Sequence, residues 1–487
     1  MEWTLAQVAR ALGVAAPAAL DPARRLAGVA IDSRTVGVGE LFFAVRGERH
    51  DGHDFVPAAL AAGAAAGVVS RARLDGYSNA LRGRLFAVEG DPLDALQLLA
   101  RAVRTQWGEQ NSARRLVGVT GSVGKTTTKE ILAALLGARL RVLKSAGNLN
   151  NQFGVPLMLL RLGGSHDAAV IEMGMSRRGE LARLAWMARP EVGVVTRISD
   201  VHLENFESVD GVAQAKRELL EGLVGDDPVA VLNADDPRAA RLGDGLPVRV
   251  ITFGESTAAE FRAENIRELG LDGTTFDFVA PGGRTSLRLS LVGRHNALNA
   301  LAALATASLW GIGAGGAQEI FDGLKAASMR GEVLRFAAGF AVLNDCYNSS
   351  PAALVALVDL LAATPGYRRR ILVAGEMLEL GPAAAELHRE AGRHAVSRRA
   401  ADWIFGVRGQ AQEIVSGAIE AGHPADRARF FASAEEVADF LERVVEPGDL
   451  ILVKGSRGVH LEKVVDALRA KHDASAVSTA GDAGSRG

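Results

Sequence analysis

The sequence is poor in cysteine, in aromatic residues and in long apolar runs, and neither sign of charge is in excess. Cys346 is the only cysteine in 487 residues, which excludes an intrachain disulfide and a cysteine-only zinc site and fits a reducing compartment. Aromatic residues make up 5%, and 55 Lys and Arg against 57 Asp and Glu leave a net charge of −2. No global field therefore favours nucleic acid or an anionic membrane, and any anion site must be local.

No segment has the pattern of a membrane span or a secretion signal. Residues Met1–Leu12 lack a basic region followed by a continuous apolar core, and they predict a short amphipathic helix after Thr4. Ala58–Val69 is rich in Ala and Gly and far shorter than the roughly 20 residues that a spanning helix needs. We therefore expect a cytoplasmic protein that does not insert into membranes.

The length of the chain exceeds what one hydrophobic core usually organises, so we expect about three domains. Short apolar runs between Leu26 and Val88 alternate with turn-rich segments and one Ala-rich helix, which predicts a small α/β domain. A helical pattern over Asp91–Trp107 follows and ends in the polar segment Gly108–Arg114. The first domain, with its connecting helix, is therefore placed at residues 1–112.

Two further α/β series follow. Residues 113–327 alternate strand-like and helical patterns, which predicts a covered, mostly parallel sheet closed by a helix at Asn296–Trp310. Residues 328–472 predict an open Rossmann-like sheet, and the small polar residues 473–487 predict a disordered tail. The fold class expected is α/β with three domains. The predicted strands are Leu116–Thr120, Ala168–Glu172, Val192–Ile198 and Pro228–Asn233, then Phe340–Asp345, Arg370–Ala374, Trp403–Val407, Arg429–Ala432 and Asp449–Val453.

A phosphate-binding loop is the strongest signal in the sequence. Leu116–Val119 runs into Thr120-Gly121-Ser122-Val123-Gly124-Lys125-Thr126-Thr127, and a helical pattern follows. Glycines let backbone amides approach phosphate, the helix N-terminus adds positive charge, Lys125 neutralises terminal phosphates and the Thr126 hydroxyl can bind Mg²⁺. Val119 stands where the strict pattern has its first glycine. We expect ATP and Mg²⁺ at residues Thr120 to Thr127.

Two side chains follow strands of the central sheet and could reach the same crevice. Glu172 ends one apolar strand and His202 follows another, at the edge where open α/β sheets bind ligands. Both are candidate Mg²⁺ ligands, although Glu172 alone would also fit a helix cap and His202 a surface residue. By spacing, Lys216 is only a solvated charge on a helix.

The loop in the form Thr-Gly-x-x-Gly-Lys-Thr resembles that of the Mur ligases and folylpolyglutamate synthetases. His202-Leu-Glu-Asn-Phe, followed by Gly-Val-Ala-x-Ala-Lys216-x-Glu-Leu, resembles the Mur ligase segment that carries a carbamylated lysine. The resemblance implies that Lys216 bears an N-carbamate that positions Mg²⁺. It also implies that Lys125, Glu172 and His202 complete the catalytic set.

The N-terminal stretch resembles the UDP-binding domain shared by the last two ligases of the Mur pathway, although composition alone would fit an ordinary turn-rich α/β domain. The matching segments are Asp32-Ser33-Arg34, Gly39–Ala44, Gly47-Glu48-Arg49 and Asp51–Phe55. This resemblance implies contacts with a UDP-linked substrate from Ser33, Arg34, Phe43 and Asp51.

The segment Ser145–Pro156 is dense in amides and glycines, which suits a polar ligand. Its order, together with Thr-Thr-Thr-Lys-Glu at residues 126–130, resembles the family member that adds D-alanyl-D-alanine to UDP-N-acetylmuramoyl tripeptide. The resemblance implies substrate contacts from Asn148 and Asn151. The ligase that adds the third amino acid to UDP-N-acetylmuramoyl dipeptide is the alternative within the family, and a non-catalytic nucleotide-binding regulator is the alternative outside it.

The remaining family matches lie around the adenosine and in the last domain, and the resemblance covers roughly residues 26–465. The family often has Asp-Asp-Ser-Tyr-Asn where this chain has Asn344-Asp345-Cys346-Tyr347-Asn348, and we expect Cys346 to be a small buried residue rather than a nucleophile. By chemistry alone, Asn233 and Asn296 fit helix capping and turn formation as well as they fit a hydrogen bond to a base or ribose. The implied nucleotide contacts are Asn233, Asn296, Arg330 and Asp345, and the residues implied to face nucleotide or substrate are Asn348, Lys454 and Arg457.

The reaction implied is ATP-dependent amide ligation through an acyl phosphate, in peptidoglycan synthesis. It releases ADP, phosphate and UDP-N-acetylmuramoyl pentapeptide. Retention of Glu172, His202 and Lys216 argues against the non-catalytic regulator. We expect a monomer whose partners are the UDP-linked tripeptide and D-alanyl-D-alanine, with no nucleic acid.

Overall fold

The computed structural model describes residues 3–199, 205–206 and 208–472, and the chain forms two compact units. The first unit contains the residues up to Ser199, Asp210–Phe261 and Asn299–Gly313, and the second contains Arg262–Leu298 and the residues from Ala314 onward. Both are mixed α/β with parallel strands, as the sequence predicted. The three domain boundaries remain predictions, and the predicted tail lies outside the described residues.

The first unit begins with a sheet of four parallel strands in the order β1-β2-β3-β4. All three residues of β2 are buried, as expected where helices cover both faces of a parallel sheet. The helix predicted after Thr4 is present, capped by the Thr4 hydroxyl and ended by Gly13 at φ 66°. The elements are α1 Leu5–Leu12, β1 Val29–Ala30, β2 Leu41–Phe43, α2 Val56–Ala61, β3 Ala66–Ser70, α3 Asn79–Arg82 and β4 Leu85–Val88.

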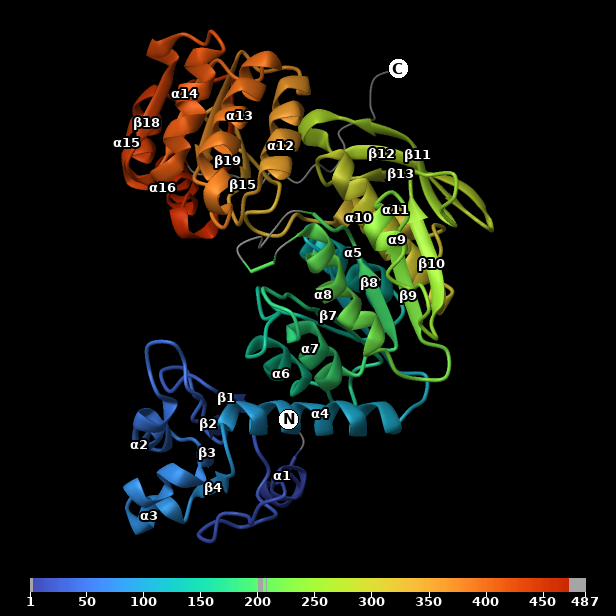
Figure 1. The fold of residues 1–487 in the computed structure, drawn as a ribbon, viewed down its shortest axis with the longest axis vertical. Helices are drawn as coiled ribbons and strands as arrows, with labels where there is room; N and C mark the ends of the chain where they lie inside the picture. The colour runs from blue at the N-terminus through green and yellow to red at the C-terminus, as the bar shows by residue number, and fades with distance from the viewer. Residues whose placement is uncertain (1–2, 200–204, 207, 473–487) are drawn as a thin grey trace, which may run out of the picture. The chain divides into compact units, whose positions relative to one another are not determined.

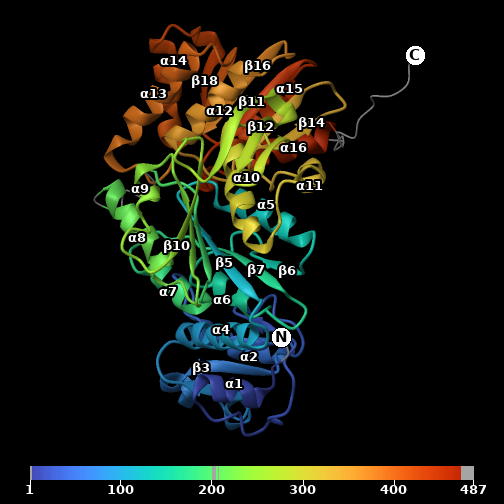
Figure 2. The same ribbon diagram turned by 90° about the vertical axis from the view of Figure 1, so that its right-hand side faces the viewer.

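In the other sheet of the first unit, six parallel strands follow the order β10-β9-β8-β5-β7-β6. Strands β10, β5, β7 and β6 are labelled in Figure 2. The carboxyl ends of β5, β7, β8 and β9 therefore meet at one edge, where ligands bind in such sheets. Strands β6 and β10 were not predicted. The elements are β5 Arg115–Thr120, α5 Lys125–Gly137, β6 Val142–Lys144, α6 Gly154–Leu159, β7 Ala168–Glu172, α7 Glu180–Ala188, β8 Val192–Val195, α8 Val209–Glu221, β9 Val229–Asn233, α9 Pro237–Ala240 and β10 Arg249–Gly254.

Helix α4, Pro92–Glu109, leads from the four-stranded sheet to the six-stranded one. Asp91 begins the helix, because its side chain accepts a hydrogen bond from the backbone N–H of Leu93. The helix packs against α6 and α7 (Figure 1). It therefore joins the two sheets of the first unit through side-chain packing as well as through the chain.

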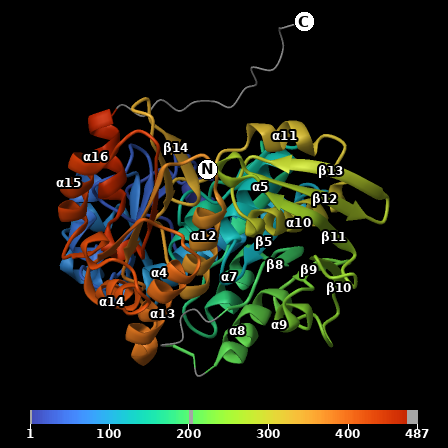
Figure 3. The ribbon, with the colours of Figure 1, turned by 90° about the horizontal axis from the view of Figure 1, so that it is seen from above.

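The second unit contains three antiparallel strands and a separate six-stranded sheet. Alternate residues of that six-stranded sheet supply two cores, one with Leu372 and Leu452 against α12, α13 and α14, and one with Val373 and Val453 against α15 and α16 (Figure 3). This two-faced arrangement is the predicted open α/β sheet. The first elements of the unit are β11 Phe261–Glu268, β12 Thr274–Ala280, β13 Gly283–Leu289, α10 Arg294–Ala307, which runs into the first unit, and α11 Ala317–Gly323.

The order of the second unit's six-stranded sheet is β14-β15-β19-β16-β17-β18. Five strands are parallel, and β14 is an antiparallel edge strand that the sequence analysis did not predict. Among the described residues, no helix is both long enough and apolar enough to cross a membrane. The elements are β14 Glu332–Arg335, β15 Ala341–Asp345, α12 Pro351–Ala363, β16 Arg369–Gly375, α13 Ala384–Ser397, β17 Trp403–Val407, α14 Gln412–Glu420, β18 Ala428–Phe431, α15 Ala434–Val444, β19 Asp449–Lys454 and α16 Glu462–His472.

Glycines allow α13 and α14 to approach each other closely. A β-carbon on Gly392 would overlap the carbonyl oxygen of Ile414. We expect Gly392→Ala to lower the free energy of unfolding by about 2 kcal/mol, because backbone must move to make room. Gly323→Ala in α11 is the control, since nothing lies within 4 Å of its β-carbon position. Thermal unfolding of both variants measures the effect, and equal midpoints would contradict this packing.

Candidate active site

The phosphate loop connects β5 to α5, and two of its glycines have no room for a side chain. Gly121 has φ 146° and its β-carbon would overlap the Thr196 hydroxyl, whereas Gly124 has φ 85° and faces the Asn299 side chain. Both conformations favour glycine. Val119 is buried inside β5, which explains why no glycine is needed there. The loop predicted from Thr120 to Thr127 therefore has the strand-loop-helix form of a phosphate cradle.

The Lys125 and Thr126 side chains project from the first turn of α5. The Lys125 ammonium donates to the carbonyl oxygens of Gly121 and Ser122, at 2.8 and 3.3 Å, so it lies over the loop. The Thr126 hydroxyl donates to Glu172 Oε2 at 2.8 Å, and Glu172 is almost fully buried at the end of β7. The alternative of Glu172 as a helix cap is wrong, because its carboxylate meets a side chain of the phosphate loop.

The Thr126–Glu172 pair suits Mg²⁺ by the chemistry of its donors. Mg²⁺ is usually held by one or two carboxylates together with phosphate oxygens and water. In the described part of the chain, no group of three or more His, Cys, Asp or Glu side chains could hold a metal. His202, the other expected ligand, lies outside the described residues. One carboxylate and one hydroxyl beside a phosphate cradle are the donors that the described residues offer.

Lys129 is a buried cation at this site that the sequence analysis did not single out. Its ammonium is 1% exposed and lies 2.9 Å from Glu130 Oε1 and 3.9 Å from Glu172 Oε2. It also donates to the Ser145 carbonyl at 2.9 Å. Lys144 pairs with Glu130 from the surface at 2.5 Å. Charges of alternating sign thus run from the buried Glu172 to the protein surface.

Lys216 is buried in the middle of α8, so the interpretation of a solvated helix charge is wrong. Its side chain is 2% exposed. Burial, and secondarily the positive charge of Lys125, lowers the pKa of Lys216 well below that of an ordinary lysine. A lower pKa favours the neutral amine, which is the form that can act as a nucleophile.

The amide-rich loop after β6 is tied to the same carboxylate. Asn150 donates through Nδ2 to Glu172 Oε1 at 2.9 Å, and its own carbonyl accepts from the Gly174 N–H at 2.8 Å. Asn151 accepts from the Gly154 N–H at 2.9 Å, which begins α6. Asn148 is exposed on the loop. Asn148 and Asn151 were predicted as substrate contacts, whereas their neighbour Asn150 is the residue that contacts Glu172.

Asn233 holds the ends of two neighbouring strands together. Its Nδ2 donates to the Thr196 carbonyl after β8 at 2.8 Å, and its Oδ1 accepts from the Asp235 N–H at 2.9 Å. In the second unit, the buried Asn296 donates to the Val292 carbonyl at 2.8 Å within the first turn of α10. Both amides serve turn or helix-end geometry here, and their nucleotide contacts remain predictions.

Three predicted residues of the second unit meet where β15 and β19 end side by side. The buried Lys454 ammonium lies 2.5 Å from Asp345 Oδ2 and 3.0 Å from the Asn348 carbonyl. Arg330 stacks its guanidinium 4.0 Å from the centre of the Tyr347 ring. Arg457 lies 3.5 Å from Glu462 Oε1, a partner that the sequence analysis missed. The geometry thus brings Asp345, Asn348 and Lys454 together at the ligand-binding edge of this sheet.

Cys346, beside this cluster, is fully buried. Burial raises the pKa of its thiol to about 12. Its sulfur donates weakly to Asn344 Oδ1 at 3.0 Å. These properties match the expected small buried residue and not a nucleophile.

A buried histidine organises another loop at the same edge. His388 accepts from the Met377 N–H through Nε2 at 2.8 Å, and its Nδ1 lies 2.6 Å from the Ala384 carbonyl. Burial lowers the pKa of His388, which keeps Nε2 available as an acceptor. The histidine that anchors the loop after β16 therefore lies on the following helix, α13.

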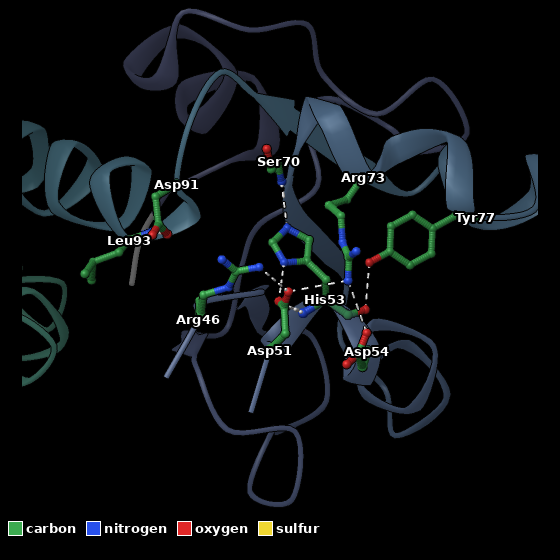
Figure 4. A network of polar contacts seen from close by, with 9 residues as sticks. All are labelled: Arg46, Asp51, His53, Asp54, Ser70, Arg73, Tyr77, Asp91 and Leu93. Atoms are coloured by element: carbon green, nitrogen blue, oxygen red, sulfur yellow. Dashed lines mark hydrogen bonds and ion pairs between the residues drawn. The ribbon is translucent and has the colours of Figure 1, made fainter. Parts of the chain in front are cut away.

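Asp51 is the centre of a polar network in the N-terminal sheet (Figure 4). The His53 ring contacts Asp51 Oδ1 through Nδ1 at 2.6 Å and accepts from the Ser70 N–H through Nε2 at 3.0 Å. Arg46 and Arg73 reach Asp51 Oδ2 at 3.2 and 3.4 Å. Burial opposes ionisation of Asp51, but hydrogen bonds from His53 and Arg46 outweigh it and lower its pKa to about 2. Asp51 therefore has a structural part here, and its substrate contact remains a prediction.

The other predicted substrate residues of this sheet differ in exposure. Arg34 is exposed and forms a two-point ion pair with Asp32, with Nη2 to Oδ2 at 2.7 Å. Ser33, the residue between Asp32 and Arg34 in the sequence, is half-buried. Phe43 is completely buried in β2, so its side chain presents no surface to a ligand in this structure. Ser33 and Arg34 are thus the residues of this group that a ligand could reach.

Three family profiles match successive parts of the chain. The profile described as Mur ligase family, catalytic domain matches residues 25–102. The profile for the Mur ligase middle domain matches residues 119–307, and the one for the Mur ligase, glutamate ligase domain matches residues 329–457. The middle profile contains the phosphate loop, Glu172 and Lys216.

Individual relatives are similar along nearly the whole chain. The UDP-N-acetylmuramoyl-tripeptide--D-alanyl-D-alanine ligase of Bacillus subtilis strain 168 is 35% identical over 441 residues, covering 91% of this chain and 93% of that protein. The crystal structure of MurF from Acinetobacter baumannii is 29% identical with a TM-score of 0.83, covering 97% and 99% of the two chains. The MurF ligase of Thermotoga maritima, solved in complex with ADP, is 29% identical with a TM-score of 0.77, covering 91% and 97%.

The buried ion pairs of Lys129 predict a strong effect of its removal. We expect Lys129→Met to lower the free energy of unfolding by about 3 to 5 kcal/mol, because the Glu130 and Glu172 carboxylates lose their buried cation. Lys144→Met is the matched control, since Lys144 is half exposed and surface ion pairs contribute only about 0 to 1 kcal/mol. Denaturant unfolding compares the two, and equal losses would contradict the structural role of Lys129.

Proposed function

Because the chain belongs to the Mur ligase family, we propose that it joins D-alanyl-D-alanine to UDP-N-acetylmuramoyl tripeptide at the expense of ATP. The observation that carries this proposal is the 2.8 Å contact between Thr126 of the phosphate loop and Glu172, whose other oxygen is bonded to Asn150. A nucleotide cradle, a metal carboxylate and an amide-rich loop thus share one edge of one sheet. Similarity along nearly the whole chain to ligases named for this activity supports the same substrates.

The reaction has two steps. The terminal carboxylate of the tripeptide attacks the γ-phosphorus of ATP, which breaks the bond to ADP and gives an acyl phosphate. The neutral amine of D-alanyl-D-alanine then attacks the acyl carbon, the amide bond forms, phosphate leaves and the amine proton passes to solvent or a base. Backbone amides of the loop and Lys125 would hold the phosphates in line, and charge stabilisation of this kind is the main catalytic contribution in phosphoryl transfer.

Mg²⁺ would be held by Thr126 and Glu172, with His202 as a further predicted ligand. When bound, it would supply charge neutralisation for the β- and γ-phosphates. Lys129 and Asn150 fix the Glu172 carboxylate from two sides, so this carboxylate would need little rearrangement to bind Mg²⁺.

We further propose that Lys216 reacts with CO₂ to form an N-carbamate. The neutral amine attacks the carbon of CO₂, a C–N bond forms as one C=O π bond breaks, and the nitrogen loses one proton, so a neutral amine becomes an anionic carbamate. Burial and the lowered pKa of Lys216 support this chemistry, because an ordinary lysine is protonated at neutral pH. As an anion, the carbamate would be attracted by the positive charge of Lys125, whereas the ammonium form of Lys216 would be repelled by it.

The other assignments are part of the same proposal. Asn233, Asn296, Arg330 and Asp345 would contact the nucleotide, and Lys454, Asn348 and Arg457 would face nucleotide or incoming dipeptide. The UDP end of the substrate would lie on the N-terminal sheet near Ser33 and Arg34. A cytoplasmic location and a monomeric state complete the proposal.

The first test is ATP turnover with defined substrates. We expect phosphate release only when UDP-N-acetylmuramoyl tripeptide and D-alanyl-D-alanine are both present, with a pentapeptide product identified by its mass. Tripeptides ending in diaminopimelate or lysine should be compared, because the third residue sets the substrate variant. Turnover with UDP-N-acetylmuramoyl dipeptide and a free amino acid would assign the preceding ligase step instead. Absence of turnover would favour a nucleotide-binding regulator.

The second test concerns the carbamate. Lys216→Ala should lose most activity, and a short added carboxylic acid should restore part of it by replacing the lost anion. Arg217→Ala on the same helix is the control, since the Arg217 side chain points to the Leu242 carbonyl, at 2.9 Å. This variant should keep its activity and should not respond to the added acid. With ¹³C-labelled CO₂, the native protein should give a carbamate signal that Lys216→Ala lacks. The same spectrum from both proteins would rule out the modification.

A further inference from the structure

Gln97 is a buried amide in the second turn of α4, and both ends of its side chain are bonded. It is 2% exposed. Its Nε2 donates to the carbonyl oxygen of Gln152 at 3.1 Å, and its Oε1 accepts from Arg183 Nε at 2.6 Å. A buried amide is stable only when its polar atoms are satisfied, so this geometry specifies one orientation of the side chain.

The bond to Gln152 reaches the amide-rich loop. That loop is held at its start by Lys129, which donates to the Ser145 carbonyl, and in its middle by Asn150, which donates to Glu172. Gln97 holds it near its end, two residues before α6 begins at Gly154. The loop that carries Asn148 is therefore fixed between the metal carboxylate and helix α4.

Other polar residues of α4 attach the helix to different places. Arg101 donates to the Trp186 carbonyl and stacks on the Trp186 ring, and Arg104 donates to the Ala188 carbonyl at 2.8 Å. Trp107 donates to the His166 carbonyl at 3.1 Å. These contacts secure α4 on α7 and on the α6–β7 connection. Gln97 also contacts α7 through Arg183, but its Nε2 is what bonds the amide-rich loop to α4.

Helix α4 also begins directly at the N-terminal sheet. Only Glu89, Gly90 and Asp91 separate its first residue from β4. Through α4, the Gln97 bond therefore links the sheet proposed to hold the UDP end of the substrate to the loop whose Asn148 and Asn151 are predicted to contact the substrate.

From this placement we propose that Gln97 is a positioning residue that sets the loop from Asn148 to Gln152 relative to the N-terminal sheet. A substrate bound at both ends reacts fastest when the two sites already have the right spacing, and small misplacements cost large factors in rate or affinity. Gln97 would supply that spacing for the UDP-linked tripeptide. The inference rests on the proposed function, because it takes the tripeptide as the ligand of the loop.

Gln97→Met tests it in the full-length protein. Methionine has about the length of glutamine and can stay buried, but it makes neither hydrogen bond. The carbonyl of the exposed Gln152 can then bond to water instead. We expect the KM for UDP-N-acetylmuramoyl tripeptide to rise about tenfold, or about 1.4 kcal/mol, with the KM for ATP unchanged. Binding of UDP alone should be unaffected, because only the coupling between the two ends is lost. Amide hydrogen exchange over residues 150–154 should become faster.

Arg101→Met is the matched control, one helical turn further along α4. It removes a contact with α7 and should lower thermal stability without raising the KM for the tripeptide. Unchanged exchange and unchanged KM in Gln97→Met would overturn the inference. Faster exchange with an unchanged KM would also overturn it, by showing that the loop does not hold the tripeptide. Failure of the proposed function would be seen separately, as a native protein that does not turn over this substrate.

Discussion

The burial of one carboxylate, that of Glu172, is the constraint on which the rest of the first unit depends. A buried charge is costly unless hydrogen bonds and an opposite charge surround it. Here the hydroxyl of Thr126 and the ammonium of Lys129 come from α5, and the amide of Asn150 comes from the loop after β6. Each segment is thereby fixed with respect to the phosphate loop. A carboxylate proposed to bind Mg²⁺ thus also determines how the strand, the helix and the loop around it are arranged.

Local patterns were enough to predict the elements of the fold that depend on local sequence. The phosphate loop was identified because its glycines, its lysine and its flanking strand and helix are adjacent in sequence, and the buried strands were identified because their apolar runs are continuous. Strand β6 has only three residues and β14 is half-buried at a sheet edge, so neither has a clear apolar run. The resemblance to a known family supplied the site assignments that spacing alone could not.

Residues whose environment is made by distant segments could not be predicted in the same way. In the sequence, Lys129 has the pattern of an ordinary charged residue on a helix. Only the fold places it beside Ser145 and Glu172, which are up to 43 positions away. Gln97 meets Gln152 across 55 positions. Lys216 was predicted from spacing to be solvated, yet the packing of α8 buries it. The missed residues share one property, that long-range packing rather than local pattern gives them their partners.

The single thiol has a practical consequence. Cys346 is enclosed in the core of the second unit, and its pKa of about 12 keeps it protonated at neutral pH. Maleimide and iodoacetamide reagents act on accessible thiolates, so the native chain should give almost no background in such labelling. A pair of surface cysteines, one in each unit, could carry a donor and an acceptor dye without first removing a native thiol. The spacing of the two units during turnover would then be measurable by energy transfer in solution.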